Sequence, residues 1–390
     1  MKIALVDPSL FTLPYDSDLA HALIGRGHEV ALYGRAVVPA EAAVRPRFLV
    51  EHFYGELAAV AAARWPRGLA KVAKGAAHVR GMRRLVAALR RAEPDVIHFQ
   101  WLPLPVVDDR FLPALRRIAP LVATAHDSRP FNANPTSAVQ QIGASGILRR
   151  FDRVIVHTAQ ARDRLVGGGL EPGSVALVPH GVSAAPAAAP SGRGRRDRGD
   201  RRVSFLLLGR VKPYKGVDVL IEAVRRMPEA DRRRCRVLVA GRPYMDMGPL
   251  EAARAAVADC VGFDLRFLSE AEMARLLEDA DAFVFPYREI DTSGVFCDSL
   301  RLCRPIVASR IGAFAELLED GRHALLVPPD DPDALAAALS RVVNEPGLRA
   351  GMADALAALA DRLPSWDSVA GETLAIYRSA RDAARVRVAA

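Results

Sequence analysis

Cysteine is scarce in this chain of 390 residues: it occurs four times, always in the second half, and never in a C-x-x-C pair. A dense disulfide framework is therefore excluded. No His, Cys, Asp and Glu set has zinc spacing, so we expect no metal. No apolar run approaches the roughly 20 residues that span a bilayer, and the chain begins with a strand-like run that ends at Asp7. We expect a cytoplasmic protein with neither a membrane span nor a signal peptide.

Acidic residues are missing from residues 57–92, which contain nine Lys or Arg. The net charge is +8 over residues 1–190, +4 over residues 191–202 and −3 over residues 203–390. A basic segment of this kind indicates an anionic partner, such as a membrane surface, a nucleic acid or a polyanionic substrate. We expect no nucleic acid, because the sequence has neither an aromatic-rich RNA-binding pattern nor a helix-turn-helix signature.

Residues 80–91 have the periodicity of an amphipathic helix within this basic segment. Its cationic stripe is formed by Arg80, Arg84 and Arg91, and its apolar side by Met82, Leu85, Val86 and Leu89. We expect the apolar side to pack on a sheet while the cationic side faces outward. Gly75 and Gly81 argue against one unbroken amphipathic membrane helix from residue 69 onward.

Short apolar runs alternate with helical stretches along the whole chain, which indicates parallel sheets whose strands are buried on both faces. In the first half these runs are residues 2–7, 27–34, 94–100, 121–127, 151–158 and 175–181, with a first helix at 18–26. In the second half they are residues 203–210, 236–242, 265–269, 281–287, 304–309 and 323–329.

The length and an ordinary content of 51% hydrophobic and 25% charged residues favour two domains. We predict an α/β protein made of two doubly wound, Rossmann-like domains that face each other across a cleft, with ligands at the carboxyl ends of the strands. The predicted parts are an N-terminal domain at 1–183, an Ala, Pro, Gly and Arg-rich linker at 184–202, a C-terminal domain at 203–365, and a closing helix at 366–390.

The string GRVKPYKG, residues 209–216, follows a predicted strand and precedes a helix. Gly209 lacks a side chain and can admit a ligand, while Arg210 and Lys215 project from the turn. Two cations beside a helix N-terminus suit a diphosphate, since the guanidinium, the ammonium and the helix dipole all favour negative charge. The alternative is a surface turn that happens to be basic.

The string EIDTSGVFCDSL, residues 289–300, follows another predicted strand. Thr292 or Ser293 can cap a helix, Gly294 lets a ligand approach the backbone, and Asp298 lies one turn into the helix. Free N–H groups there can hold phosphate oxygens and the carboxylate can accept sugar or ribose hydroxyls. The alternative is an ordinary capped helix.

These strings, with others in the same order, resemble the GT-B-fold retaining glycosyltransferases of family 4. The second half contributes GRVKPYKGVDVLIEAV, RVLVAGR, LLEDADAFVFPY, the block from SGV to RPIVAS, and IGAFAELLEDGRHALLVPPDDPDALAAAL. The first half contributes GHEV, PDVIHFQW, TAHD and VPHGV. The resemblance therefore covers nearly the whole chain, and the order and spacing of the motifs make it specific.

The resemblance implies a role for individual residues. Arg210 and Lys215 match the pair that contacts the donor diphosphate, and His126 matches a histidine close to the donor sugar. Asp298 takes the place of the second glutamate of the Glu-x7-Glu motif, which is expected to hold the ribose. The remaining matches are the phosphate loop Ser293, Gly294 and Val295, the strand end Gly241 and Arg242 near the base, and Glu316 of the G-x-P-E turn.

Two departures from the family pattern stand out. Ile290 occupies the place of the first glutamate, so Glu289 or Asp291 is expected to replace it as the acceptor of sugar hydroxyls. The first loop lacks the Gly-Gly pair that the family often has near the phosphates, and Tyr15 and Asp16 are the candidates for contacts with the acceptor.

The resemblance implies a retaining, metal-independent hexosyltransferase that needs no cofactor, only a nucleotide diphosphate sugar as donor. We expect it to glycosylate an acceptor hydroxyl in cell-envelope polysaccharide or glycolipid synthesis, peripherally on the inner face of the membrane if the acceptor is lipid-linked. The alternatives are a catalytically silent relative that only binds a nucleotide sugar, and an enzyme that glycosylates a soluble small molecule.

Overall fold

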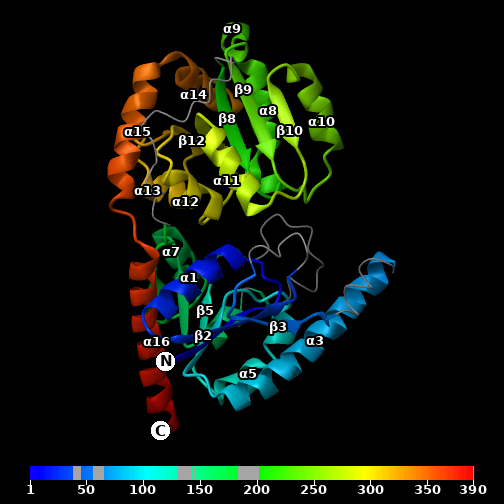
Figure 1. Ribbon diagram of the computed structural model, residues 1–390, viewed down its shortest axis with the longest axis vertical. Coiled ribbons are helices and arrows are strands. Elements are labelled where there is room, and N and C mark those ends of the chain that lie inside the picture. Colours follow the sequence, from blue (N-terminus) through cyan, green and yellow to red (C-terminus); the bar gives the residue numbers. More distant parts are fainter. Residues whose placement is uncertain (38–44, 56–65, 130–142, 145, 183–201, 390) are drawn as a thin grey trace. The chain divides into compact units, whose positions relative to one another are not determined.

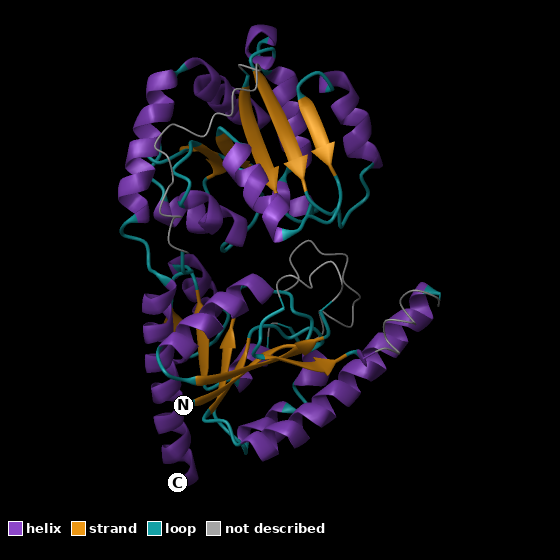
Figure 2. Cartoon of the chain, viewed as in Figure 1, coloured by secondary structure: helices purple, strands orange, loops and turns teal. Residues whose placement is uncertain are grey.

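The computed structural model describes residues 1–37, 45–55, 66–129, 143–144, 146–182 and 202–389, and it divides into two compact units (Figures 1 and 2). The first unit holds the described residues from Met1 to Pro179 and those after Ser365, and the second holds those from His180 to Ser365. The predicted linker lies outside the described residues except for Arg202.

The first unit is built on a parallel sheet of seven strands in the order β3-β2-β1-β4-β5-β6-β7. Its strands are β1 (Lys2–Asp7), β2 (Glu29–Arg35), β3 (Leu49–Phe53), β4 (Val96–Phe99), β5 (Leu121–Thr124), β6 (Arg153–Val156) and β7 (Val175–Leu177). Chain order reverses between β1 and β4, so the topological switch point lies between these two strands. Ligands of doubly wound sheets bind at the carboxyl ends of the strands around such a point.

Helices cover both faces of this sheet, because successive residues of each strand point to opposite faces. Ile3 and Leu5 pack in one core with α1 and α16, and Ala4 and Val6 pack in another with α3, α5 and α7. The helices are α1 (Leu13–Gly25), α3 (Arg67–Ala92), α4 (Pro105–Asp108), α5 (Leu112–Arg116), α7 (Ala159–Gly167) and α16 (Trp366–Ala389), with 3-10 turns η2 (Ile147–Arg150) and η3 (Pro172–Ser174). The predicted closing helix is thus α16, and it packs against α1 of the first unit.

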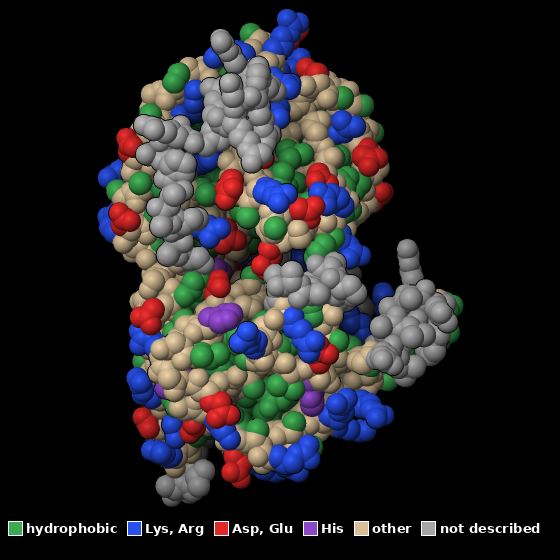
Figure 3. Space-filling view, viewed as in Figure 1, with side chains coloured by type: hydrophobic (Ala, Val, Ile, Leu, Met, Phe, Trp, Pro, Cys, Tyr) green, Lys and Arg blue, Asp and Glu red, His purple; other side chains and the backbone are tan. Residues whose placement is uncertain are grey.

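Helix α3 carries the basic segment and is longer than the sequence predicts. The four apolar residues expected to face a sheet are buried, and Arg80, Arg84 and Arg91 are exposed, as predicted. Gly75 and Gly81 nevertheless do not break the helix itself, since α3 is continuous from Arg67 to Ala92. Lys and Arg side chains gather along this part of the surface (Figure 3).

The second unit is a parallel sheet of six strands in the order β10-β9-β8-β11-β12-β13. Its strands are β8 (Val203–Leu208), β9 (Cys235–Ala240), β10 (Val261–Asp264), β11 (Ala282–Phe285), β12 (Ile306–Ser309) and β13 (Leu325–Val327). Chain order reverses between β8 and β11, which places the switch point of this sheet next to the two motifs at 209–216 and 289–300.

Helices cover both faces of the second sheet as well. Phe205 and Leu207 pack in one core with α8, α10 and α14, while Leu206 and Leu208 pack in the other with α11, α12, α13 and α15. The helices are α8 (Val217–Arg226), α9 (Glu229–Arg232), α10 (Gly248–Arg254), α11 (Glu270–Asp279), α12 (Gly294–Leu300), α13 (Gly312–Leu317), α14 (Pro332–Asn344) and α15 (Pro346–Ala360), with 3-10 turns η4 (Pro213–Lys215) and η5 (Ala255–Val257).

Three elements differ from the sequence-based prediction. The first helix begins at Leu13 rather than at residue 18, because Pro14 occupies its first turn, where a missing N–H is tolerated. Strand β3 was not predicted. The strand expected at 265–269 is instead β10, which ends at Asp264, since Ser269 already caps α11 through a capping box with Glu272.

In the part of the chain that the structure describes, no helix combines the length and the apolar character needed to cross a membrane.

The two glycines of α3 provide a matched test of its packing. A Cβ at Gly81 would lie 2.5 Å from Cδ1 of the buried Phe53, whereas a Cβ at Gly75 would meet no heavy atom within 4 Å. We expect Gly81→Ala to lower the free energy of unfolding by about 1 kcal/mol or more through overpacking. Gly75→Ala should raise it by roughly 0.5–1 kcal/mol, because alanine favours the helix. Urea unfolding of both variants checks this, and shifts of the same sign would contradict it.

Candidate active site

Glycines follow the neighbouring strands β8 and β9 in the second unit. Gly209 has φ 108° and Gly241 has φ 132°. A Cβ on Gly241 would lie 2.3 Å from the carbonyl oxygen of Gly209, so the two backbones approach too closely for any side chain at 241. The sequence assigned both glycines to donor binding, and the structure places them side by side at the carboxyl ends of β8 and β9.

The ammonium group of Lys215 occupies the space beside Gly209. Nζ donates a hydrogen bond of 2.9 Å to the carbonyl oxygen of Leu208 and lies 4.9 Å from the centroid of the Tyr287 ring. A Cβ on Gly209 would lie 2.9 Å from this Nζ and 3.3 Å from Cγ2 of Val295. The loops that follow β8 and β11 therefore meet at Lys215.

Burial changes the chemistry of this amine. Lys215 is only 4% exposed. Its burial, and then the positive charge of Arg210, lower the pKa of Lys215 to about 7. The side chain of Arg210 is exposed. The two cations that the sequence assigned to a diphosphate therefore lie close enough to repel each other, and a bound dianion would relieve that repulsion.

Two features fix the turn that carries Lys215 against the loop after β11. Gly216 is in the left-handed region with φ 64°, and a Cβ there would lie 2.0 Å from the carbonyl oxygen of Pro286. The guanidinium of Arg288 donates to Pro213 O at 2.9 Å, and it also forms ion pairs with the carboxylates of Asp218 and Asp330. Sequence analysis missed Arg288, since Asp218 and Asp330 lie 70 and 42 residues away in the chain.

The predicted phosphate loop leads into α12. Ser293 is the N-cap residue, but its side chain makes no capping hydrogen bond. Gly294 is exposed, and a Cβ there would meet nothing within 4 Å. Because the side chain of Val295 borders Gly209, this loop lies beside the two cations.

Asp298 is exposed on α12, and it has a carboxylate neighbour that sequence analysis missed. This neighbour is Glu270, the first residue of α11. Burial, and then the charge of Asp298, raise the pKa of the Glu270 carboxyl. The pairing joins segments 28 residues apart in sequence, so no local motif signals it.

The structure separates the candidates for the missing first glutamate. Ile290 is buried in the core, Asp291 is buried, and Glu289 is half-buried. The carbonyl oxygen of Asp291 accepts a 2.8 Å hydrogen bond from the Ala313 amide at the start of α13. The backbone of Asp291 thus supports α13.

The other predicted donor residues also lie on loops or helices that follow strands. Glu316 is exposed on α13, after β12. Arg242 is exposed after β9, with its guanidinium 5.7 Å from the centroid of the Tyr244 ring. Both positions are open to solvent.

In the first unit, His126 follows β5 and lies in a cluster of aromatic rings. The Tyr15 ring packs edge-on at 4.7 Å between centroids, and the His157 ring lies at 5.2 Å. Tyr15 also contacts Trp366 of α16. The sequence pointed to His126 and Tyr15 separately, and the structure brings them together.

Asp16 is fully buried in the first turn of α1. The hydroxyl of Thr12 donates to both of its carboxylate oxygens, at 3.1 and 3.2 Å. Burial and the neighbouring Asp7 raise the pKa of Asp16 well above its usual value. Asp16 therefore serves the structure of the loop after β1 and offers no exposed oxygen to an acceptor.

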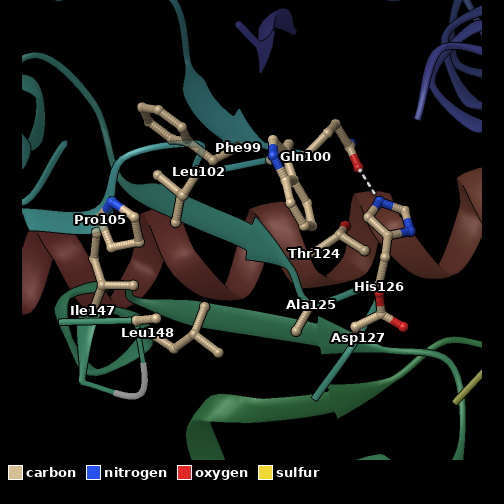
Figure 4. A pocket seen from close by; sticks show the side chains of 12 residues that line it. Phe99, Gln100, Leu102, Pro105, Thr124, Ala125, His126, Asp127, Ile147 and Leu148 are labelled. Carbon is tan, nitrogen blue, oxygen red and sulfur yellow. Dashed lines mark hydrogen bonds between the residues drawn. The ribbon is translucent and has the colours of Figure 1, made fainter. Parts of the chain in front are cut away.

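A pocket opens at the carboxyl ends of β4 and β5 (Figure 4). One end is polar, with Gln100, Thr124, His126 and Asp127, and the other is apolar. The apolar lining comprises Phe99, Trp101, Leu102, Pro105, Ala125, Ala144, Ile147 and Leu148. A hydroxyl-bearing molecule with an apolar side fits this division. Among the described residues, no group of three or more His, Cys, Asp or Glu side chains could hold a metal ion.

Two family models match the two halves of the chain. Residues 202–345 match the family described as Glycosyl transferases group 1, and residues 17–185 match Glycosyltransferase Family 4. The chain is 30% identical to D-inositol 3-phosphate glycosyltransferase of Actinosynnema mirum, over 96% of this chain and 93% of the relative. It is 29% identical to phosphatidyl-myo-inositol mannosyltransferase of Mycolicibacterium smegmatis, over 97% and 94%.

Among solved structures, Anabaena HepE in complex with UDP and glucose superimposes with a TM-score of 0.75 at 18% identity, covering 97% of this chain and 100% of that one. This similarity shows the GT-B fold. Together with the full-length relatives, it means that the chain belongs to the family 4 glycosyltransferases.

Proposed function

We propose that this glycosyltransferase moves a hexosyl group from a nucleotide diphosphate sugar to a hydroxyl, with retention at the anomeric carbon and without a metal ion. The observation that carries the proposal is the Lys215 ammonium, buried beside Gly209 and Val295, with Arg210 next to it. Departure of the nucleoside diphosphate builds negative charge, and preformed cations lower the barrier by favouring that charge as it develops.

The proposed transfer step needs no reactant other than the donor and the acceptor. The bond from the anomeric carbon to the leaving phosphate oxygen breaks, and the acceptor oxygen attacks the same face of the sugar. The acceptor proton passes to the leaving phosphate. The protein's part is to hold the diphosphate with Arg210, Lys215 and the Ser293–Val295 loop, and to bind the sugar through His126.

Carboxylates would orient the rest of the donor. We propose that Asp298, with Glu270 beside it, accepts the ribose hydroxyls. Glu289 replaces the missing first glutamate rather than Asp291, because Glu289 is half-buried and Asp291 is buried with its backbone supporting α13. The burial of Ile290 at the usual glutamate position favours a second candidate function, a silent relative that binds a nucleotide sugar without turnover.

For the acceptor, we propose a hydroxyl compound attached to a membrane lipid, bound at the cytoplasmic face in envelope glycolipid or polysaccharide synthesis. The exposed arginines of α3 support this, and so do Leu69 and Val72 near its start, which are 58% and 70% exposed. The phosphatidyl-myo-inositol mannosyltransferase relative is named for a lipid acceptor. A soluble acceptor in the pocket beside His126 is the alternative.

The diphosphate contacts are tested by Arg210→Ala and Lys215→Ala, with Arg225→Ala as a control. Arg225 is an exposed arginine at the far end of α8. We expect each site variant to lower kcat/KM for the nucleotide sugar by at least about 10²-fold, since a charge-assisted contact to the developing anion is worth roughly 3 kcal/mol. The control should keep its activity. A folded site variant with near-normal turnover would show that its residue takes no part in the mechanism. A wild-type protein that binds the nucleotide sugar without turning it over would show that the protein is the catalytically silent relative.

The low pKa of Lys215 predicts that nucleotide binding takes up a proton above pH 7. The free protein holds this amine largely neutral at pH 8, and a bound diphosphate restores the ammonium, so affinity should fall up to about tenfold per pH unit above 7. Without nucleotide, the buried Lys215 ammonium lowers the free energy of unfolding below pH 7. This loss of stability disappears as the pH rises from about 7, the pKa of Lys215 in the folded protein, towards 10.5, its ordinary pKa. Calorimetry of UDP or GDP binding in HEPES and in Tris measures the uptake. It should vanish in Lys215→Met, and equal uptake in that variant would contradict the assignment.

The membrane proposal predicts salt-sensitive sedimentation with vesicles that contain phosphatidylglycerol, and little with phosphatidylcholine alone. Reversing Arg80, Arg84 and Arg91 to Glu should weaken binding at least tenfold, because each basic residue near an anionic surface contributes about 1 kcal/mol. Reversing the exposed Arg233, Arg322 and Arg341 of the second unit is the charge-matched control. Failure of the wild type to sediment at low salt would leave the soluble acceptor as the better account.

A further inference from the structure

A chain of hydrogen bonds connects the carboxyl ends of β4, β5 and β6 in the first unit. Nε2 of His157 lies 3.3 Å from Nδ1 of His126, and Nε2 of His126 lies 3.2 Å from Oε1 of Gln100. This series of hydrogen bonds ends on one side at Val178 O, which is 2.9 Å from Nδ1 of His157. On the other side the Gln100 amide nitrogen is 3.3 Å from Nδ1 of His98.

The contacts at the two ends of this hydrogen-bond series determine which ring nitrogens carry hydrogens. A carbonyl oxygen can only accept, so Nδ1 of His157 carries a hydrogen and donates it to Val178. The amide nitrogen of Gln100 can only donate, so Nδ1 of His98 accepts from it, as it does from the Tyr377 hydroxyl at 2.7 Å. The Gln100 amide is oriented with Oε1 toward His126, and in this orientation Nε2 of His126 carries a hydrogen and donates it.

The contact between the two imidazoles requires one more hydrogen. Two neutral imidazoles carry two N–H groups in all, one on each ring. Here one N–H faces Val178, one faces Gln100, and a third must lie between the rings. Three hydrogens on four ring nitrogens correspond to one positive charge.

We propose that His126 and His157 form a pair that shares one extra proton, and that His157 is the positioning residue that holds the His126 ring and its hydrogens. This inference rests on the proposed function, in which His126 binds the transferred sugar. His157 is 7% exposed and His126 lines the pocket, so the pair supplies a cation from within the unit and presents it through His126.

The groups around the pair fit a shared proton. The titratable groups that face it are Tyr15 of α1 and, through Gln100, His98 of β4 and Tyr377 of α16, while Asp127 follows His126 in the chain. Burial, and then the charge of His157, lower the pKa of His98 to about 3. His98 is therefore neutral and leaves the extra proton to the other two rings.

The proton count is tested without substrate by ¹⁵N NMR of protein labelled at histidine, at pH 7. Assignment uses the variants His126→Gln and His157→Gln. We expect three of the four ring nitrogens of the pair to give the protonated signal, or its exchange average. We also expect the His126 signals to shift in His157→Leu but not in His21→Leu, a change on the exposed surface of α1. Two protonated nitrogens, or His126 signals unaffected by His157→Leu, would overturn the proposal.

Kinetics then test the positioning role in the full-length enzyme. His157→Leu should lower kcat at least tenfold with less than a threefold change in KM for the donor. His157→Gln should recover most of the loss, because its side-chain oxygen can accept from Nδ1 of His126. Full activity in His157→Leu would refute the positioning role of His157. The proposed function would still stand in that case, because the wild-type enzyme is active. Equal losses in the Leu and Gln variants, with folding preserved, would refute it as well.

Discussion

The ammonium group of Lys215 lies where only a glycine at position 209 leaves room, and the donor side of the second unit follows from that constraint. Gly241 lets the end of β9 approach Gly209, and Gly216 with Arg288 fixes the turn against the loop after β11. The result is an amine that the protein has already desolvated, with its pKa lowered to about 7, beside the Ser293–Val295 loop. In the proposed reaction, such a site would favour the charge that develops on the leaving diphosphate without reorganisation at that moment.

In the proposed mechanism, the first unit contributes imidazoles where the second contributes an amine. His126 takes its place through Gln100 and His157, which follow the strands on either side of β5. In the proposed pair, the cation would be shared between the buried His157 ring and the His126 ring that lines the pocket, and His126 would present it to a neutral sugar or a hydroxyl. In both units the residue proposed to carry the chemistry lies in the segment that follows a buried strand: Lys215 after β8 and His126 after β5.

Much of this could be predicted because parallel strands buried on both faces leave long, regular apolar runs. The two sheets, the motif glycines and the paired cations were found in this way, since Gly209, Arg210 and Lys215 are close in sequence. Arg288 with Asp218 and Asp330, Glu270 with Asp298, and His157 with His126 were missed, because each pair joins distant segments. The early start of α1 was missed because Pro14 normally signals a break, whereas here it lies in the first turn of the helix. The continuity of α3 was missed because Gly81 also normally signals a break, whereas here it packs against Phe53.

In the proposed reaction, cations of the protein hold the donor diphosphate. The most direct measurement is calorimetric titration of UDP and GDP into wild-type protein and Lys215→Met after dialysis against EDTA, with UMP and GMP as references. We expect a diphosphate to bind the metal-free wild type at least tenfold more tightly than the monophosphate, and Lys215→Met to remove this difference. Binding that appears only after magnesium or manganese is added, or a difference that survives in the variant, would contradict it.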